Sequence, residues 1–142
     1  MIVRREVTTP AAIEKVFAYL SDFTTTTQWD PGTVRTVLVR GDGGPGTEYR
    51  TTSRFAGRQT ELTYVVTRRQ RPEVIALRGE NGAVVAEDTI TLERVPDGTR
   101  VVYVAGFTFK GVWRLASPFL GPAFRRLGDE AESGMRAALA DL

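Results

Sequence analysis

The sequence predicts an α+β fold, in which one antiparallel sheet of six or seven strands packs against a long helix near the end of the chain. Two observations lead to this prediction. Apolar and polar residues alternate with a period of two over most of residues 33–110, and short stretches with turn residues separate the alternating segments. From Ser117 onward the period changes to three or four residues, as in an amphipathic helix. Hairpin-linked strands form an antiparallel sheet, and the apolar side of such a helix has to be buried on one of its faces.

The chain is expected to begin with a strand and a short helix. Residues 2–9 alternate between apolar and polar side chains, as a strand does. Thr9 is expected to cap the helix that follows, with Pro10 in its first position and its end near Ser21 or Asp22. The apolar stripe of this helix consists of Ile13, Val16, Phe17 and Leu20.

The segment after this helix, residues 22–32, has the sequence DFTTTTQWDPG. Threonine is a poor helix former, and the stretch shows no alternating apolar pattern, so we expect a loop here. The Asp-Pro-Gly sequence at its end indicates a turn into the next strand.

Turn sequences divide the middle of the chain into strands. We expect these strands at residues 33–40, 47–55, 59–70, 73–80, 83–95 and 99–110. Alternate side chains of a strand point to opposite faces of a sheet. Each strand is therefore expected to turn one apolar face toward the helix.

The closing helix is expected to extend for roughly 25 residues from Ser117. Its apolar stripe consists of Leu120, Phe124, Leu127, Ala131, Met135, Ala138 and Leu142. Pro122, Gly128 and Gly134 interrupt the pattern, although glycine inside a helix is unfavourable relative to alanine. Either the helix bends at Pro122, or the glycines allow close packing on the sheet, or the helix is not selected for rigidity.

The composition limits the possible functions. The 142 residues are expected to form one domain, and a formal net charge of only +2 gives no argument for nucleic acid as a partner. The chain has no histidine and no cysteine. Catalytic triads, Cys-His pairs and ordinary zinc or iron sites are therefore excluded, and we expect no metal and no other cofactor. We find no membrane span and no secretory signal, and expect a cytoplasmic location.

The whole chain resembles a known superfamily. The resemblance rests on the hairpin sequence PDGTRVVY, the closing amphipathic helix and an opening pattern formed by Pro10, Val16, Phe17, Leu20, Asp22 and Trp29. This order is similar to the START-like (SRPBCC) helix-grip superfamily, and within it to the polyketide cyclase/dehydrase and lipid-transport group. The resemblance implies a single domain over residues 1–142, in which a curved antiparallel sheet wraps around the C-terminal helix. It also implies an internal cavity, which in this superfamily holds lipids, sterols, aromatic polyketides or plant hormones.

The apolar faces of the strands and of the closing helix indicate which side chains line such a cavity. The ligand-binding candidates are Trp29, Tyr49, Thr51, Ser53, Phe55, Tyr64, Ile90, Tyr103, Phe107, Trp113, Phe124 and Leu127. The set combines apolar and aromatic side chains with a few hydroxyls, which is typical of a small-molecule site. We expect an apolar, lipid- or polyketide-like small molecule as the partner, and a homodimer is also compatible with the sequence.

Trp29 and the threonines before it have two interpretations. In the superfamily, the segment after the first helix tends to lie over the mouth of the cavity. This implies that Thr24–Thr27 form a mobile rim and that Trp29 forms an apolar lid. Alternatively, Trp29 only closes the core. The lid interpretation predicts that a Trp29→Ala variant keeps its fold and loses affinity for an apolar probe.

Asp88 is an exception on an otherwise apolar strand face, which it shares with Ala86 and Ile90. A carboxylate there has to be paired, protonated or solvated. Asp88 is interpreted as a general base or an anchor for a ligand hydroxyl, unless the strand ends near water or its register shifts. Tyr103 and Arg114 are the other catalytic candidates, because the resemblance implies that cyclases of this fold polarise a carbonyl with arginine or tyrosine.

These observations leave three functions open. The first is binding of an apolar or aromatic small molecule, and the second is catalysis as a cofactor-free polyketide cyclase or dehydratase. The third is a ligand-free interaction or dimerisation domain. A cavity on the order of several hundred Å³ would exclude the third. A buried carboxylate with a perturbed pKa, facing the cavity, would favour the second.

Overall fold

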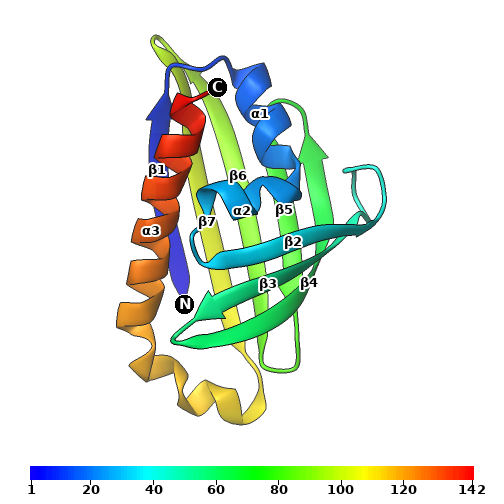
Figure 1. Ribbon diagram of the computed structural model, residues 1–142, viewed down its shortest axis with the longest axis vertical. Helices are drawn as coiled ribbons and strands as arrows, with labels where there is room; N and C mark the ends of the chain where they lie inside the picture. The colour runs from blue at the N-terminus through cyan, green and yellow to red at the C-terminus, as the bar shows by residue number, and fades with distance from the viewer.

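The computed structural model describes residues 1–142 and has the α+β architecture that the sequence predicts (Figure 1). Its seven strands are β1 (Ile2–Thr9), β2 (Thr33–Arg40), β3 (Glu48–Phe55), β4 (Arg58–Gln70), β5 (Val74–Glu80), β6 (Val84–Val95) and β7 (Gly98–Phe109). Its α-helices are α1 (Ile13–Ser21), α2 (Thr26–Trp29) and α3 (Gly121–Ala140). Three short 3₁₀ helices are η1 (Phe23–Thr25), η2 (Gly111–Leu115) and η3 (Ser117–Phe119).

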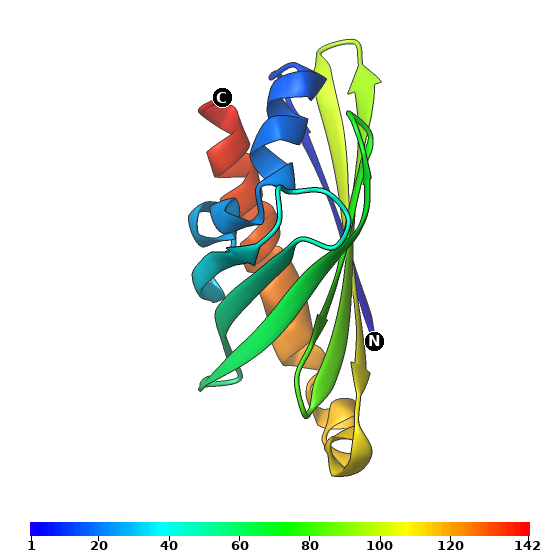
Figure 2. The same cartoon turned by 90° about the vertical axis from the view of Figure 1, so that its right-hand side faces the viewer.

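The strands form one antiparallel sheet in the order β1-β7-β6-β5-β4-β3-β2. Strands β2 to β7 pair with their neighbours in sequence, and β1 pairs with β7 at the far edge. Register shifts between β2 and β3 and between β4 and β5 mark bulges, which bend and twist a sheet. The helices lie on one side of the curved sheet, and α3 runs along β1 (Figures 1 and 2). This is the helix-grip arrangement that the resemblance implies.

The first helix begins later than the sequence predicts. β1 stays paired with β7 through Thr9, which lies opposite Thr99, and α1 begins only at Ile13, with Ala12 as its N-cap. The prediction that Thr9 caps the helix is therefore wrong. Its hydroxyl donates instead to the carbonyl oxygen of Leu139 at 3.1 Å, which ties β1 to the last turn of α3.

The threonine segment is helical, so the predicted loop is wrong. Each threonine hydroxyl in the segment has a partner, because each donates to an oxygen atom near the preceding turn. These hydrogen bonds run from Thr24 to Asp22 Oδ1 (2.6 Å), from Thr25 to the Asp22 carbonyl (2.8 Å), from Thr26 to the Phe23 carbonyl (2.8 Å) and from Thr27 to the Thr24 carbonyl (3.1 Å). The Thr26 hydroxyl also shares a 2.7 Å hydrogen bond with Thr36 on β2. The segment is thereby fixed to the sheet.

The irregular residues of α3 have two roles. Pro122 lies in the first turn, where proline is tolerated, so of the three alternatives the bend at Pro122 is not needed. Gly128 and Gly134 mark close contacts. A Cβ atom at Gly128 would lie 2.5 Å from Val3 of β1, and one at Gly134 would overlap the carbonyl oxygen of Trp29. The glycines therefore let α3 approach β1 and α2 closely.

The hydrophobic core lies between the sheet and the helices and includes 20 buried residues. The strands turn the predicted faces inward, as Leu62, Tyr64 and Val66 on β4 and Ala86 and Ile90 on β6 show. No helix of the structure has both the length and the apolar character that crossing a membrane requires.

Candidate functional site

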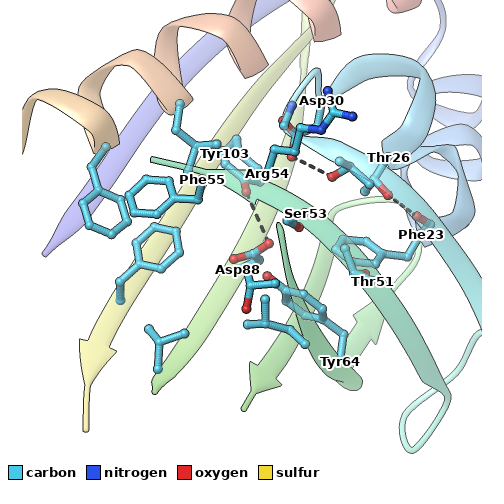
Figure 3. Close-up of a pocket in the computed structure, with 18 of the residues that line it drawn as sticks. Phe23, Thr26, Asp30, Thr51, Ser53, Arg54, Phe55, Tyr64, Asp88 and Tyr103 are labelled. Atoms are coloured by element: carbon cyan, nitrogen blue, oxygen red, sulfur yellow. Dashed lines mark hydrogen bonds between the residues drawn. The ribbon is translucent and has the colours of Figure 1, made fainter. Parts of the chain in front are cut away.

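A cavity of about 110 Å³ lies between the sheet, α2 and α3 (Figure 3). Nine of the twelve ligand-binding candidates line it: Trp29, Thr51, Ser53, Phe55, Tyr64, Tyr103, Phe107, Phe124 and Leu127. Asp88 lines it as well. The apolar faces of β3, β4, β6 and β7 therefore converge on one enclosed space, with α3 on its other side.

Four candidate residues lie elsewhere. Tyr49 and Ile90 are buried in the core and do not line the cavity. Trp113 and Arg114 lie on η2 and are exposed, 45% in the case of Trp113. The sequence placed this segment close to the start of the long helix. In the structure it forms a separate turn at the surface, so the expectation that Arg114 faces the cavity is wrong.

The cavity also has lining residues that the sequence reasoning did not select. They are Phe23, Thr26, Asp30, Gly32, Thr33, Arg54, Thr60, Leu62, Val84 and Phe109. Leu62, Val84 and Phe109 fall on the inward faces that strand alternation identifies, so the sequence contained a signal for them. Asp30 and Gly32 belong to a turn sequence, and nothing in a turn pattern indicates that it borders a cavity.

Aromatic rings enclose the cavity on two sides. On one side, the ring of Phe124 packs against those of Phe55, Phe107 and Phe109, with centroid distances of 4.5, 4.6 and 5.8 Å. On the other side, Phe23 lies 5.0 Å from Tyr64 (Figure 3). Tilted aromatic contacts of this kind add to the stabilisation from apolar burial.

Asp88 lies on the inward face of β6 with only 4% of its surface exposed. Its neighbours across the sheet are Leu77 and Ala105, whose side chains have no hydrogen-bond donors. The Tyr103 hydroxyl donates to Asp88 Oδ2 at 3.2 Å, whereas Asp88 Oδ1 has no partner (Figure 3). Burial raises the pKa of Asp88 to about 7; the Tyr103 hydrogen bond opposes this effect and the charge of Asp30 adds to it. Such a carboxyl group can accept or donate a proton near neutral pH.

Two tyrosines accompany Asp88 in the wall. Burial, together with the negative charge of Asp88, raises the pKa of Tyr64 and of Tyr103 well above the ordinary value of a phenol. Both therefore keep their protons at neutral pH and remain able to donate hydrogen bonds. The ring of Tyr64 lies against Gly79 on the neighbouring strand, where a Cβ atom would come within 2.6 Å of the ring. Gly79 thus determines where the Tyr64 ring lies.

Asp30 is a second carboxylate in the wall. Its Oδ1 accepts from the Gly32 backbone N–H at 3.0 Å, and its Oδ2 accepts from the Thr33 hydroxyl at 3.0 Å. Burial raises the pKa of Asp30, although both hydrogen bonds oppose this effect. Both oxygens of Asp30 thus fix the turn into β2, whereas Asp88 keeps one oxygen free.

Trp29 lies in the wall of the cavity and belongs to the core, with 2% of its surface exposed. Its ring meets that of Tyr103 edge-on, with a centroid distance of 5.6 Å. The mouth lies elsewhere. Four residues line both the cavity and an outer hollow of about 510 Å³ beside the β3–β4 hairpin and α3: Gly32, Arg54, Phe55 and Leu127. The expectation that Thr24–Thr27 form the rim of the mouth is therefore wrong.

Comparison with known proteins identifies one family, and solved structures share the fold. Residues 1–142 match the family described as polyketide cyclase / dehydrase and lipid transport. A comparison with curated proteins finds no significant match.

Several solved structures share the fold. The protein TTHA0849 from Thermus thermophilus has a TM-score of 0.83 at 16% identity, covering 99% of this chain and 98% of its own. The Zhui aromatase/cyclase from a Streptomyces species has a TM-score of 0.83 at 16% identity, covering 98% of this chain and 93% of its own. A START superfamily protein from Mycobacterium smegmatis has a TM-score of 0.73 at 20% identity, covering 99% of this chain and 94% of its own.

Proposed function

Because this chain belongs to the polyketide cyclase/dehydrase and lipid transport family, we propose that it binds an apolar or aromatic small molecule in the cavity between its sheet and α3. The observation that carries the proposal is the cavity itself, a mostly apolar space with several aromatic rings and polar groups in its wall. Small-molecule sites in proteins have this composition.

The size of the cavity limits what fits inside it. An engineered apolar cavity of about 150 Å³ binds benzene, so about 110 Å³ corresponds to one small ring. This volume is below the several hundred Å³ that would by itself exclude a ligand-free domain. A lipid- or polyketide-like ligand would place one end in the cavity and extend through the mouth into the outer hollow beside Arg54 and Leu127.

Toluene is a suitable first probe, because the two tryptophans report on different places. Trp29 lines the cavity and Trp113 is exposed on η2. On titration with toluene, the indole N–H signal of Trp29 in a ¹H–¹⁵N NMR spectrum is expected to shift, while that of Trp113 stays in place. A Trp113→Phe variant assigns the two signals. If neither signal moves in the folded protein with toluene or with phenol, the binding proposal fails and a ligand-free interaction domain is the better interpretation.

A second candidate function is that of a cofactor-free cyclase or dehydratase, and the position of Asp88 favours it. A buried carboxyl group with a pKa of about 7 at a cavity wall is suited to remove a proton from a carbon atom next to a carbonyl group. The hydroxyl of Tyr103 donates to Asp88 Oδ2 and so holds the carboxyl group at this place. The aromatase/cyclase with a TM-score of 0.83 shows that this fold hosts such an activity in another protein.

Deuterium exchange into cyclohexanone tests this second function. In heavy water, the Asp88 carboxylate would take a proton from the carbon next to the carbonyl, and the resulting enolate would then accept a deuteron. We expect exchange to be faster with the wild type than with Asp88→Asn, and to rise as Asp88 ionises around pH 7. Glu87→Gln, which removes an exposed carboxylate on the same strand, is the control. Equal exchange rates for wild type and Asp88→Asn would exclude Asp88 as the base.

A further inference from the structure

Two buried polar atoms, on residues that line the cavity, lack hydrogen-bond partners. They are Oδ1 of Asp88, a residue that is 4% exposed, and Nε1 of Trp29, a residue that is 2% exposed. Buried polar atoms are nearly always hydrogen-bonded, because an unmade bond leaves the cost of removing the group from water uncompensated. Asp88 Oδ1 is an acceptor and Trp29 Nε1 carries a donor, so a ligand has to supply a hydrogen-bond donor to the first and an acceptor to the second.

No protein group pairs with either atom in this structure. Leu77 and Ala105 lie beside Asp88 on the neighbouring strands, and the Tyr103 hydroxyl is already used by Oδ2. Tyr103 also contacts Trp29, since their rings lie 5.6 Å apart. The free acceptor and the free donor thus belong to two side chains that both contact the same tyrosine, and all three residues line one small cavity.

The charges around the cavity limit the ligand further. Asp30 and Asp88 both line it, and Arg54 at the mouth is the only cationic residue in the lining. The Arg54 residue is exposed, so water screens its charge. A carboxylate ligand would therefore meet two acidic groups without a buried cation to offset them.

From these contacts we infer that the cavity selects neutral hydroxylated rings, with a ligand hydroxyl donating to Asp88 Oδ1 and a ligand oxygen accepting from Trp29 Nε1. The inference rests on the proposed binding function and specifies its ligand class. Hydrocarbons of the same shape and ring carboxylates are disfavoured.

A hydroxyl group also suits the titration of Asp88. The pKa of Asp88 is about 7, so at neutral pH the group is present in both protonation states. A hydroxyl can donate to the carboxylate and accept from the carboxylic acid. A ketone oxygen pairs only with the acid, and an ammonium group only with the carboxylate.

Phenol and toluene test the inference, because they have the same shape and number of heavy atoms. An entirely apolar cavity would bind phenol much more weakly than toluene, since the hydroxyl would lose its hydration without compensation. We expect wild-type protein to bind phenol at least as tightly as toluene. In Asp88→Leu, the ratio of phenol affinity to toluene affinity is expected to fall about tenfold. Asp88→Asn, which keeps polar atoms at this position, is expected to retain more of the preference.

Two further measurements test where the ligand binds and whether the cavity prefers a neutral ligand. Toluene and phenol are both expected to shift the Trp29 indole N–H signal, but phenol is expected to move it further downfield than toluene, because only phenol has an oxygen that can accept a hydrogen bond. Benzoate is expected to bind at least about tenfold more weakly than neutral benzamide. Benzoate binding equal to that of benzamide would overturn the charge argument.

The outcomes separate this inference from the proposed function. If toluene binds wild type and Asp88→Leu equally, and the phenol preference is the same in both, the cavity binds small molecules but Asp88 does not select a hydroxyl. The inference then fails alone. If toluene and phenol both fail to bind the folded protein, the proposed function fails with it. Toluene binding by Asp88→Leu also shows that this variant is folded.

Discussion

An Asp88→Asn variant is expected to be more stable than wild type by about 3 to 4 kcal/mol at pH 8, and by less than about 1 kcal/mol at pH 4. The expectation follows from burial. The pKa of Asp88 is raised from 3.8 to about 7 because the folded protein removes its carboxyl group from water. Asparagine has nearly the same shape, cannot ionise, and still offers an oxygen to the Tyr103 hydroxyl that now bonds Asp88 Oδ2.

The sign of the pH dependence follows from which state holds the proton. Between about pH 4 and pH 7, folded Asp88 keeps a proton that the unfolded chain has already released. The contribution of Asp88 to stability therefore falls as the pH rises through this window, and it is constant above the folded pKa and below the unfolded one. Asp88 thus lowers the stability of the folded protein at neutral pH, and groups with this effect are typical of functional sites.

Urea unfolding of both proteins at several pH values between 4 and 8 measures this difference. Other ionisable groups affect wild type and variant equally, so the difference isolates Asp88. Glu87→Gln removes an exposed carboxylate one residue away and is expected to show no such pH-dependent gain. A difference between wild type and Asp88→Asn that does not change with pH would show that the pKa of Asp88 is the same in the folded and the unfolded protein, as it would be if Asp88 were solvated.

A Trp29→Ala variant is expected to lose about 3 to 5 kcal/mol of stability, because it deletes a fully buried indole from the core. The indole contacts Tyr103, and the backbone of Trp29 lies directly against Gly134 of α3. The loss therefore affects the packing of α2 between the sheet and α3. This expectation replaces the lid interpretation, under which the variant would melt like wild type.

Thermal and urea unfolding of Trp29→Ala and Trp113→Ala provide a matched comparison. Trp113 is 45% exposed on η2, and its replacement is expected to change stability by no more than about 0.5 kcal/mol. Trp29→Phe is expected to retain more stability than Trp29→Ala, since it keeps a ring in the cavity wall. If Trp29→Ala unfolds at the same temperature as wild type, Trp29 is not needed for the core, and the lid interpretation is the better one.

The sequence predicted the sheet well, because the alternation of side chains along a strand is a local property. β1 and β2 lie at residues 2–9 and 33–40 as predicted, and the other strands differ from prediction by one residue at one or both ends. The inward faces were also predicted, because alternation alone assigns Thr51, Tyr64, Asp88 and Tyr103 to one side of the sheet. Bulges in β2 and β4 did not reverse these faces within the cavity.

Local patterns were misleading where distant contacts decide the conformation. The propensity of threonine indicated a loop at Thr24–Thr27, but Thr25 and Thr26 are buried, and the hydrogen bond from Thr26 to Thr36 on β2 holds the segment in helical turns against the sheet. The cap predicted at Thr9 did not form because the pairing of β1 with β7 continues through that residue. In both cases the hydrogen bonds of the folded chain outweighed an intrinsic preference of a few tenths of a kcal/mol to about 1 kcal/mol per residue.

The sequence by itself determined that this protein is one antiparallel sheet with a closing helix, that its inward faces are aromatic, and that no histidine or cysteine takes part in its chemistry. Only the tertiary structure decided that Asp88 is buried with one free oxygen, that Trp29 is a wall of the cavity, and that the mouth lies at the β3–β4 hairpin. The physical reason is that periodicity specifies the direction of a side chain. Its hydration and its hydrogen-bond partners depend on residues far away in the chain, such as Tyr103 for Asp88 and Gly134 for Trp29.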